Sequence, residues 1–574
     1  MESNQLMTPW GETLDPQNVL KEYPRPQMVR DSYENLNGYW ECAFTAEGAK
    51  PDAWQQILVP FSPEAPLSGV GRALKPEEVL WYRRKLPKLE PEGGRVLLHF
   101  GAVDQLAEVY VSGVNVAQHM GGYTPFSADI TEALKNGEGE LLVRVKDDSD
   151  NSFHSRGKQK TARGNIWYTP QSGIWQTVWM ERVPANYITG LHITPLFDQK
   201  ACRIIVNTNA PAQVSVAFEG KTYTARSGEA IIVTPQKFIP WHPDNPHLYD
   251  FEAACGEDCV KSYFALRSVC VQEDASGVKR LHLNGEPYFH VGMLDQGYWP
   301  DGLYTAPSDE ARIYDIQLAK DMGFNMLRKH IKIEPLRWYY HCDRLGMLVW
   351  QDMINGGRKD YNLLVITAPL FTGLALKDNH YSWFKRQDVQ GREEYYQELD
   401  EMIRHLYNCP SIVMWVPFNE GWGQFDAAEA VRRIEALDTT RTIDHASGWH
   451  DQGIGDFKSL HVYFKPYKFS NDKLGRCEIL TEFGGYSFPV EGHLFNTKKS
   501  FGYKKITSLD ELAAAYQKLY DEEIIPAKAK GLSATVYTQV SDVEDEINGV
   551  VTYDRKVVKF NPAFMRAIHA QLQE

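Results

Sequence analysis

Three patterns of apolar and polar residues follow one another along the chain. Up to residue 182, short stretches such as GRVLLHFGAV, LAEVYVSGVNVAQH and GELLVRVKDD alternate apolar with polar positions and are separated by turn residues. An alternation with a period of two at this spacing predicts the strands of a β-sandwich. From 183 to 271, a second set of short strands fits a smaller, immunoglobulin-like β-sandwich.

After about residue 272 the pattern changes, because apolar strands now alternate with amphipathic helical stretches. Eight strands with crossover helices are typical of a (β/α)8 barrel. We predict strands at 287–293, 325–330, 347–353, 411–418, 442–447, 459–463, 478–484 and 533–540, and helices near 309–322, 335–345, 391–407, 426–438, 508–525 and 561–572. Two connections, near 354–390 and 485–507, are long enough to shape a catalytic site.

Two glutamates close apolar strands of the predicted barrel. Glu420 ends SIVMWVPFNE and Glu482 lies in CEILTEFGG. The C-terminal ends of parallel barrel strands open onto one shared cleft, so we expect the two carboxyls to face each other. Paired carboxyls are what a retaining glycosidase uses, one to give and take a proton and the other to attack the sugar.

The surroundings of the two glutamates favour different roles. Glu420 follows an apolar strand and precedes Trp422, an environment that raises the pKa of a carboxyl and suits a general acid. Asn419 could donate a hydrogen bond to the sugar 2-hydroxyl, although an Asn-Glu pair could also cap the next helix. Glu482 must stay ionised to act as a nucleophile. Arg328 is its expected cationic partner, and it could equally tie two barrel strands together.

Polar or aromatic residues stand at nearly every predicted strand end, which indicates a network for sugar hydroxyls. Besides Asn419, Arg328 and Trp422, the expected substrate contacts are Asp295, His330, Asp352, Trp449, His461, Tyr463 and Tyr537. Gln296, His445, Gln539 and Asp542 lie at similar positions, and some members of the whole set are expected to support others rather than touch the sugar.

Two features of the first region have competing interpretations. The aromatic residues Trp167, Tyr168, Trp175 and Trp179 could form a face on which a sugar stacks, but such residues more often fill a core. The basic run 157–165 is isolated in an acidic chain, and we expect it to form a surface loop.

Charge and cysteine usage narrow the class of protein. With 61 Lys and Arg against 75 Asp and Glu, the formal net charge is −14, which argues against nucleic-acid or anionic-membrane partners. No apolar run approaches the roughly 20 residues of a membrane span. The first residues lack the basic start and apolar run of a secretory signal. Eight scattered cysteines predict reduced thiols, so the expected location is cytoplasmic.

Other catalytic patterns are missing from the sequence, namely GxSxG, HExxH, a phosphate loop and GxGxxG. We therefore predict no cofactor and no metal site, with an oligosaccharide or small glycoside as the binding partner; a homo-oligomer is compatible with the sequence. One alternative is a carbohydrate-binding protein that has lost catalysis, but a binder needs no nucleophile. Another is a metal-dependent hydrolase on the same barrel, but paired histidine ligands are lacking.

An ordered series of motifs resembles glycoside hydrolase family 2 over nearly the whole chain. The motifs are LNGYWECAF (36–44), VPFSPEAPLSGVG (59–71), GGYTPFSADIT (121–131), SGIWQTVWME (172–181), SYFALRSV (262–269), LNGEPYFHVG (283–292), WVPFNE (415–420), TEFGG (481–485) and TQVSDVEDEINGVVTYDRK (538–556). The resemblance implies a jelly-roll sugar-binding domain with an N-terminal extension at 1–182, an immunoglobulin-like β-sandwich at 183–271 and a catalytic (β/α)8 TIM barrel at 272–574.

The resemblance also implies Glu420 as acid/base, Glu482 as nucleophile, Asn419 as a sugar contact and Arg328 as the arginine near the nucleophile. Two positions depart from the family pattern. Phe418 stands before the Asn-Glu pair, where members often carry Gly, and Tyr537 stands in the last barrel strand, where they often carry Trp.

The glycone is the least determined part of the resemblance. In glucuronidase members, an Asn-x-Lys pair before the final Gly-x-x-Thr-x-Asp-Arg binds the sugar carboxylate, whereas this chain reads Glu546-Ile547-Asn548. Glu546 would repel a uronate at close range. The resemblance thus implies a retaining exo-β-glycosidase for a terminal neutral sugar, with β-galactosides first. A uronate is the alternative, because Lys329 and Arg358 could supply positive charge.

Overall fold

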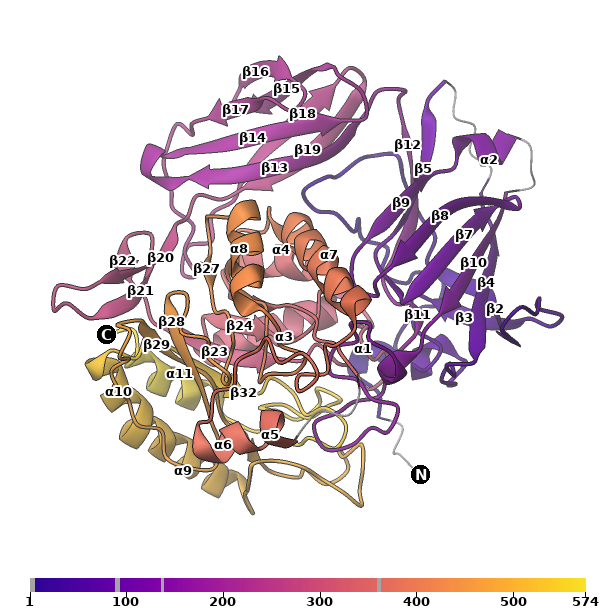
Figure 1. Cartoon of the computed structure of the whole chain (residues 1–574). Helices are drawn as coiled ribbons and strands as arrows, with labels where there is room; N and C mark the ends of the chain where they lie inside the picture. Colours follow the sequence, from indigo (N-terminus) through magenta and orange to yellow (C-terminus); the bar gives the residue numbers. More distant parts are fainter. Residues whose placement is uncertain (1–5, 88–92, 136–138, 359–362) are drawn as a thin grey trace.

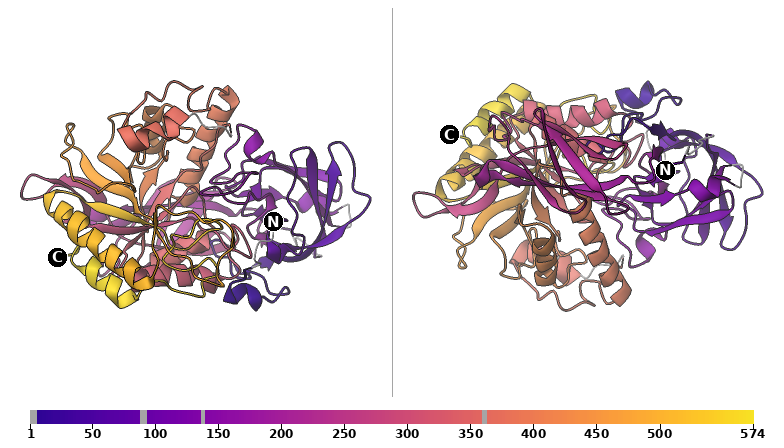
Figure 2. Two further views of the ribbon diagram at one scale, coloured as in Figure 1. Left: turned by 90° about the horizontal axis from the view of Figure 1, so that it is seen from below. Right: turned by 90° about the horizontal axis from the view of Figure 1, so that it is seen from above.

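The computed structural model describes residues 6–87, 93–135, 139–358 and 363–574. It arranges them as an N-terminal β-sandwich, a second β-sandwich and a C-terminal barrel (Figure 1). The N-terminal sandwich, indigo to violet, lies to one side of the barrel in all three views (Figures 1 and 2). The second sandwich, in magenta, contacts the barrel beyond α7, where the Thr194 and Tyr407 hydroxyls lie 3.0 Å apart.

Two antiparallel sheets form the N-terminal sandwich. Alternate residues of each strand enter a common core, as the period-two pattern requires. One sheet has the order β1 (Tyr33–Asn35), β12 (Val178–Val183), β5 (Arg95–Phe100) and β9 (Phe126–Asp129); the other has the order β3 (Gln55–Val59), β2 (Gly38–Ala46), β4 (Glu78–Lys85), β10 (Glu140–Lys146), β7 (Leu106–Val111) and β8 (Val114–Met120). A short pair, β6 (Val103–Asp104) with β11 (Gly173–Ile174), and the helices α1 (Pro9–Glu12) and α2 (Thr131–Lys135) complete this region.

The second sandwich is smaller and has its own apolar core. Its sheets are β13 (Ile188–Leu196), β14 (Ala201–Thr208) and β17 (Ala230–Val233), facing β16 (Lys221–Arg226), β15 (Gln213–Phe218), β18 (Tyr249–Cys255) and β19 (Asp258–Phe264). All eight cysteines of the chain lie in its described part and are free thiols. A three-stranded sheet of β20 (Val269–Glu273), β21 (Lys279–Leu283) and β22 (Glu286–Pro287) leads into the barrel.

Eight parallel strands build a nearly closed barrel. Their order is β27 (Thr442–Ile443), β26 (Ile412–Val416), β25 (Leu348–Asp352), β24 (Met326–Lys329), β23 (His290–Asp295), β32 (Ala534–Thr538), β29 (Cys477–Gly484) and β28 (Phe457–Val462). Each strand lies within or next to its predicted range, so the eight strand predictions are confirmed. Residues on both faces of these strands are buried, as expected for parallel strands covered by helices.

The predicted helices are confirmed, with ends that differ from the predicted ones by no more than two residues except in the helix predicted at 508–525. They are α3 (Asp309–Asp321), α4 (Leu336–Leu345), α7 (Val389–Leu406), α8 (Ala427–Leu437), α9 (Leu509–Leu519), α10 (Ile525–Lys530) and α11 (Pro562–Ala570). Ser308, Ser508 and Asn561 cap three of them by accepting backbone N–H groups. The single helix predicted at 508–525 is wrong in detail, because a π-helical turn, η4 (Tyr520–Ile524), separates α9 from α10.

The two long connections carry short elements that the apolar pattern did not predict. Connection 354–390 contains α5 (Leu363–Ile366) and α6 (Ala368–Thr372), while its residues 359–362 lie outside the described part. Connection 485–507 contains β30 (Tyr486–Ser487) paired with β31 (Lys504–Lys505). Among the described helices, none combines the length and the apolar character needed to cross a bilayer.

The segment between β10 and β11 docks the N-terminal sandwich onto the barrel. The Arg156 N–H donates to the Asn355 carbonyl at 3.0 Å, and the Ser155 hydroxyl donates to Glu398 of α7. Lys158 and Gln159 are 5% and 2% exposed. The expectation of a surface loop at 157–165 is therefore wrong for its first residues, because the loop packs against another domain.

Candidate active site

Glu420 and Glu482 meet at the C-terminal ends of the barrel strands, beside His461. One oxygen of each carboxyl and one ring nitrogen of His461 all lie within 4.8 Å of one another. His461 Nδ1 is 2.8 Å from Glu420 Oε1 and 3.5 Å from Glu482 Oε2. All three side chains are buried, so their charges act through a medium less polar than water.

The backbone at Glu420 adopts a conformation that L-residues seldom use. Its φ is 50°, and Gly421 follows with φ 71°. A non-glycine residue in this left-handed region costs about 1–3 kcal/mol and persists only when its surroundings hold it. Here the Glu420 N–H donates to the Ser447 carbonyl at 2.9 Å, and the Ser447 N–H donates to Phe418 at 2.9 Å. These bonds fix the direction of the carboxyl.

Arg328 connects the residues around the second carboxyl. Its guanidinium donates to both oxygens of Asp352 at 2.9 and 3.0 Å, to Asn419 Oδ1 at 2.7 Å and to Glu482 Oε1 at 3.3 Å. Both interpretations of this arginine hold, since it ties neighbouring strands together and lies against Glu482. The bond to Asn419 also orients that amide, whose Nδ2 has no hydrogen bond among the described residues.

Tyr463 holds the other oxygen of Glu482. Its hydroxyl donates to Glu482 Oε2 at 2.6 Å and lies 2.8 Å from Thr538 Oγ1. The ring stacks on Tyr503, with centroids 3.6 Å apart and planes 6° from parallel. Glu482 is thus held at both oxygens by groups whose own positions are fixed.

The two carboxyls are tuned in opposite directions. Burial, reinforced by the charge of Glu482, raises the pKa of Glu420 above its ordinary value. Burial alone would also raise the pKa of Glu482, but His461 and Arg328, together with the Tyr463 hydrogen bond, lower it below its ordinary value. Near neutral pH, protonation of the pair therefore falls on Glu420 rather than Glu482.

His330 lies beside Asp352, with Nδ1 2.8 Å from Oδ2. Burial takes the pKa of His330 well below its ordinary value, and the nearby charge of Lys158 adds to this. The imidazole is neutral near pH 7 as a result. A neutral imidazole held by a carboxylate on one nitrogen can offer its other nitrogen to a ligand.

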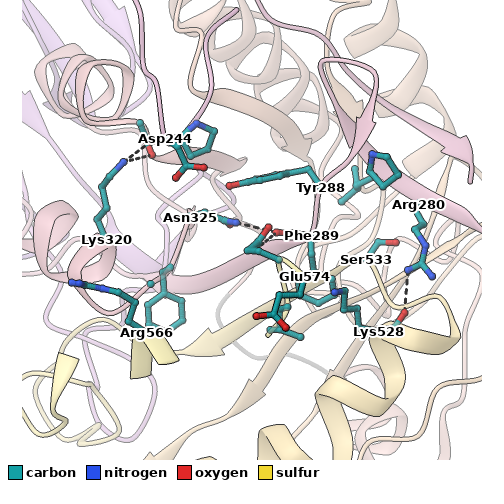
Figure 3. A pocket seen from close by; sticks show the side chains of 18 residues that line it. Asp244, Arg280, Tyr288, Phe289, Lys320, Asn325, Lys528, Ser533, Arg566 and Glu574 are labelled. Carbon is teal, nitrogen blue, oxygen red and sulfur yellow. Dashed lines mark hydrogen bonds between the residues drawn. The ribbon is translucent and has the colours of Figure 1, made fainter. Parts of the chain in front are cut away.

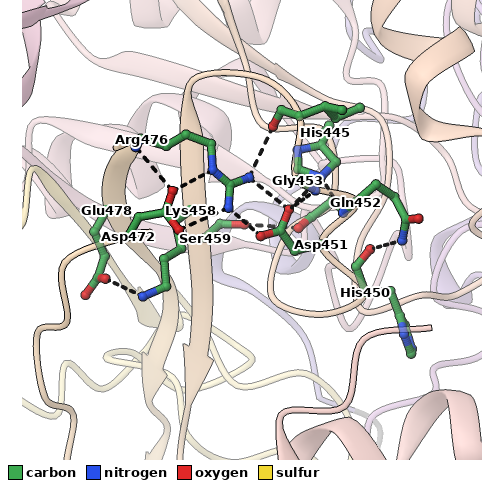
Figure 4. Close-up of polar contacts among 12 residues, drawn as sticks. His445, His450, Asp451, Gln452, Gly453, Lys458, Ser459, Asp472, Arg476 and Glu478 are labelled. Carbon is green, nitrogen blue, oxygen red and sulfur yellow. Dashed lines mark hydrogen bonds and ion pairs between the residues drawn. The ribbon is translucent and has the colours of Figure 1, made fainter. Parts of the chain in front are cut away.

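Trp449 and His461 form one rim of the site, with ring centroids 6.4 Å apart. The loop that carries Trp449 is braced by a polar network (Figure 4). In it Asp451 pairs with Arg476 at 2.5 Å and with His445 at 3.1 Å, and the Gln452 N–H donates to His445 at 3.1 Å. These contacts fix the rim without facing the carboxyl pair.

The structure does not bring two of the predicted contacts to the carboxyl pair. Asp295 accepts from Lys329 at 2.7 Å and from the Gly297 N–H at 2.8 Å, and among the described residues no hydrogen bond joins it to Glu420, His461 or Glu482. Tyr537 points outward, with its ring 5.7 Å from Phe483 and 5.0 Å from Tyr516 of α9.

The cations proposed to attract a uronate are also engaged elsewhere. Lys329 is buried between Asp295 and Glu334. Arg358 pairs with Asp388 at 2.9 Å and is 55% exposed. Both cations are thus paired with carboxylates in the structure, and a contribution of either one to a uronate site stays a prediction.

Two residues of the N-terminal domain border the site, and of these Trp167 was among the candidates for stacking on a sugar. Trp167 of the N-terminal sandwich packs on Trp422, with centroids 5.0 Å apart, whereas Tyr168, Trp175 and Trp179 are buried as the core interpretation expected. Lys158 lies 5.9 Å from the Trp422 ring centroid. Lys158 was not predicted as a site residue, because it comes from a different domain and only the docking of the two domains brings it to Trp422.

Glu420, His461 and Glu482 offer two carboxylates and an imidazole, a donor set that divalent cations accept. Glu482, however, already accepts hydrogen bonds from Arg328 and Tyr463, and the adjacent guanidinium opposes a cation. The arrangement is better suited to proton transfer and nucleophilic attack.

A second hollow, of about 580 Å³, lies at the opposite end of the barrel (Figure 3). Phe289, Asn325 and Ser533, which line it, each directly precede a barrel strand. Lys320 there donates to the Pro243 and Gly346 carbonyls at 2.6 and 3.2 Å, and the other basic groups are similarly engaged. We assign no chemistry to this hollow.

Comparison with known proteins agrees with the fold and the motifs. The family profile described as the glycosyl hydrolases family 2 sugar binding domain matches residues 72–184, and that of the family 2 TIM barrel domain matches residues 308–483. The chain belongs to glycoside hydrolase family 2.

Among curated relatives, a β-galactosidase of Thermoanaerobacter pseudethanolicus is 25% identical over 453 residues, covering 72% of this chain and 55% of that protein. A β-glucuronidase of Streptococcus agalactiae is 26% identical over 369 residues, covering 59% and 58%. The chain thus spans little more than half the length of these relatives.

Solved structures share the fold. A β-D-glucuronidase of Dictyoglomus thermophilum superposes with a TM-score of 0.72 at 18% identity, covering 96% of this chain and 98% of that one. A β-galacturonidase of Eisenbergiella tayi bound to galacturonate gives 0.69 at 18% identity, covering 96% and 99%.

Proposed function

We propose that this protein is a retaining exo-β-glycosidase that hydrolyses terminal β-glycosides by double displacement. The observation that carries the proposal is the carboxyl pair, with oxygens within 4.8 Å and pKa values displaced in opposite directions. Retaining enzymes hold their carboxyls about 5–5.5 Å apart, whereas inverting enzymes need about 6.5–9.5 Å to admit a water molecule.

In the first step Glu420, protonated because its pKa is raised, gives its proton to the glycosidic oxygen. Glu482 attacks the anomeric carbon as the bond to the leaving group breaks, forming a glycosyl ester. In the second step Glu420, now ionised, takes a proton from water, whose oxygen attacks the same carbon and releases Glu482. Asn419 Nδ2 is positioned to donate to the sugar 2-hydroxyl during both steps.

For the glycone, we propose a neutral hexose, with β-galactosides first. Glu546 supports this choice. It is buried near Lys158, which also lies over the Trp422 ring, and its carboxylate accepts hydrogen bonds from Tyr168 and Asn548. A carboxylate at the sugar wall accepts hydrogen bonds from sugar hydroxyls and repels a second carboxylate. A β-galactosidase also stands among the curated relatives.

A uronate is the second candidate. Lys158 favours it, since a buried ammonium near the site could bind a sugar carboxylate. Relatives and structural neighbours named β-glucuronidase or β-galacturonidase point the same way.

The domain borders at 182/183 and 271/272 belong to the proposal as well. In this division the N-terminal domain borders the site through Trp167 and Lys158, which suits an enzyme that accepts only the end of a sugar chain. The eight free thiols are consistent with a cytoplasmic location.

A panel of 4-nitrophenyl β-glycosides tests the proposal. Galactoside, glucoside, mannoside, arabinoside, glucuronide and galacturonide would be incubated with wild type and with Glu482→Gln. We expect turnover of the galactoside by wild type and its loss in the variant. Turnover of no glycoside by wild type, or equal turnover by the variant, would overturn the assignment.

A further inference from the structure

The backbone just before Lys158 passes through a tight gap between the N-terminal sandwich and the barrel, and this places Lys158 at the site. Gly157 has φ 67°, and a Cβ at this position would lie 2.5 Å from the Tyr304 hydroxyl. Only glycine satisfies both the left-handed backbone and the lack of space. The Arg156 N–H and the Gly157 N–H both donate to the Asn355 carbonyl, at 3.0 and 3.3 Å. The loop that presents Lys158 is therefore fixed to the barrel.

The Lys158 ammonium has no hydrogen bond among the described residues, although the residue is only 5% exposed. Its nearest carboxylate oxygen is Glu546 Oε2 at 3.9 Å, which is longer than the 2.7–3.2 Å of a hydrogen bond. Aromatic faces provide the other contacts, with Nζ 5.3 Å from the Tyr168 centroid and 5.9 Å from that of Trp422. Buried ammonium groups are normally hydrogen-bonded, so all three donors are available to a ligand.

Glu546, by contrast, is held firmly. It accepts from the Tyr168 hydroxyl through Oε2 and from Asn548 Nδ2 through Oε1 at 3.0 Å. Asn548 is in turn held by Gln539 Nε2, which donates to its Oδ1 at 2.7 Å. Each carboxylate oxygen can accept two hydrogen bonds, so Glu546 retains capacity for a ligand hydroxyl.

The Lys158–Glu546 pair borders the candidate site through Trp422. Trp422 is the common neighbour, since its ring is 6.3 Å from His330 and 5.9 Å from Lys158 Nζ. Trp422 Nε1 has no hydrogen bond among the described residues either. The charge of Lys158 also contributes to the electrostatic field at Glu420.

We propose that Lys158 and Glu546 together determine which glycone the enzyme accepts. The ammonium donates to one hydroxyl of the sugar, the carboxylate accepts from its neighbour, and the paired charges cancel. A neutral sugar satisfies both groups, whereas a uronate would place a second carboxylate beside Glu546. This inference rests on the proposed glycosidase function and adds a residue from another domain to it.

The test compares three variants of the full chain, Glu546→Gln, Lys158→Met and Arg163→Gln. Arg163 is the matched control, because it lies on the same loop and its partners are Glu544 and Asp545. The measured quantity is the ratio of kcat/KM for the 4-nitrophenyl β-galacturonide to that for the β-galactoside. Calorimetric titration with galactose and galacturonate provides a second readout that does not depend on turnover.

We expect Glu546→Gln to raise the galacturonide-to-galactoside ratio by at least about tenfold, because it leaves the Lys158 charge uncompensated. Lys158→Met should raise KM for the galactoside by about tenfold with a smaller change in kcat, since it removes a donor to the bound sugar. Arg163→Gln should leave the ratio unchanged. If Lys158→Met does not fold, Lys158→Leu takes its place, since it also lacks a donor and should give the same rise in KM.

If Glu546→Gln is active and its galacturonide-to-galactoside ratio stays within twofold of the wild-type ratio, this inference is overturned and the proposed function stays intact. If wild type prefers the galacturonide to the galactoside, Glu546 does not exclude uronates and this inference is overturned. A wild type that neither turns over a glycoside nor binds either sugar would overturn the proposed function itself.

Discussion

Arg328 offers the deepest test of how the site keeps Glu482 ionised. Its guanidinium, 3.3 Å from Glu482 and paired with Asp352, is fully buried. At an effective dielectric constant of about 20, two unit charges 3.3 Å apart attract by about 5 kcal/mol. Burial of both groups cancels part of this attraction, and His461 and Tyr463 continue to stabilise the carboxylate in a variant.

Replacing Arg328 by Met should therefore raise the pKa of Glu482 by about one to two pH units, since each unit corresponds to about 1.4 kcal/mol. The acidic limb of kcat/KM against pH should move up by the same amount, because a higher pH is then needed to ionise the nucleophile. The variant also leaves the carboxylates of Asp352 and Glu482 without their buried partner, so we expect a loss of about 3–5 kcal/mol in the free energy of unfolding.

The assay is a pH–rate profile between pH 4 and pH 9, with chemical denaturation as the stability measurement. Arg328→Lys is the control, because it keeps the charge and loses only the planar fork. It should move the acidic limb less than the Met variant does. An acidic limb that stays in place in Arg328→Met would refute the claim that this guanidinium holds Glu482 ionised.

Three further predictions concern neighbouring groups. Tyr463→Phe removes the 2.6 Å bond to Glu482, so the acidic limb should move up and kcat should fall about 10- to 100-fold; a profile that superposes on wild type would show that the bond is idle. The alkaline limb of the profile should reflect loss of the Glu420 proton, so it should disappear in Glu420→Gln, whose side chain cannot ionise. An alkaline limb that persists in this variant would belong to another group. Burial and, to a smaller extent, the charge of Glu394 raise the pKa of Glu398 to about 8. Between the ordinary pKa of a glutamate and about 8, Glu398 therefore holds a proton in the folded protein that it has lost in the unfolded chain. Stability should fall as pH rises toward 8, and Glu398→Gln should lose less of it over that range; equal pH dependence in both proteins would contradict this.

The barrel was predictable because apolar residues recur with different periods in its strands and in its helices. Apolar runs such as 412–416 and amphipathic stretches such as 427–437 are short-range signals, and the structure confirms both. Glu420 and Glu482 were identifiable for the same reason, since Glu420 lies shortly after β26 and Glu482 lies near the end of β29. The direction of Tyr537 was not, because both faces of its strand are buried and apolar patterning cannot then distinguish inside from outside.

Contacts between domains were the other part that the sequence did not reveal. Lys158 lies in a polar stretch that is typical of surface loops. Nothing in this local pattern predicts that its ammonium lies 5.9 Å from the ring centroid of Trp422 in the barrel. The engagement of Lys329 by Asp295 and Glu334 likewise depends on residues brought together by folding. Such sites depend on long-range packing, for which a single sequence carries no periodic signal.

Trapping the covalent intermediate tests the central claim most directly. Wild type would be incubated with a 2-deoxy-2-fluoro-β-galactosyl fluoride, digested, and analysed by mass spectrometry to locate the sugar adduct. We expect a single modified peptide with the sugar esterified to Glu482. An adduct on any other side chain, or release of a product of inverted anomeric configuration, would contradict it.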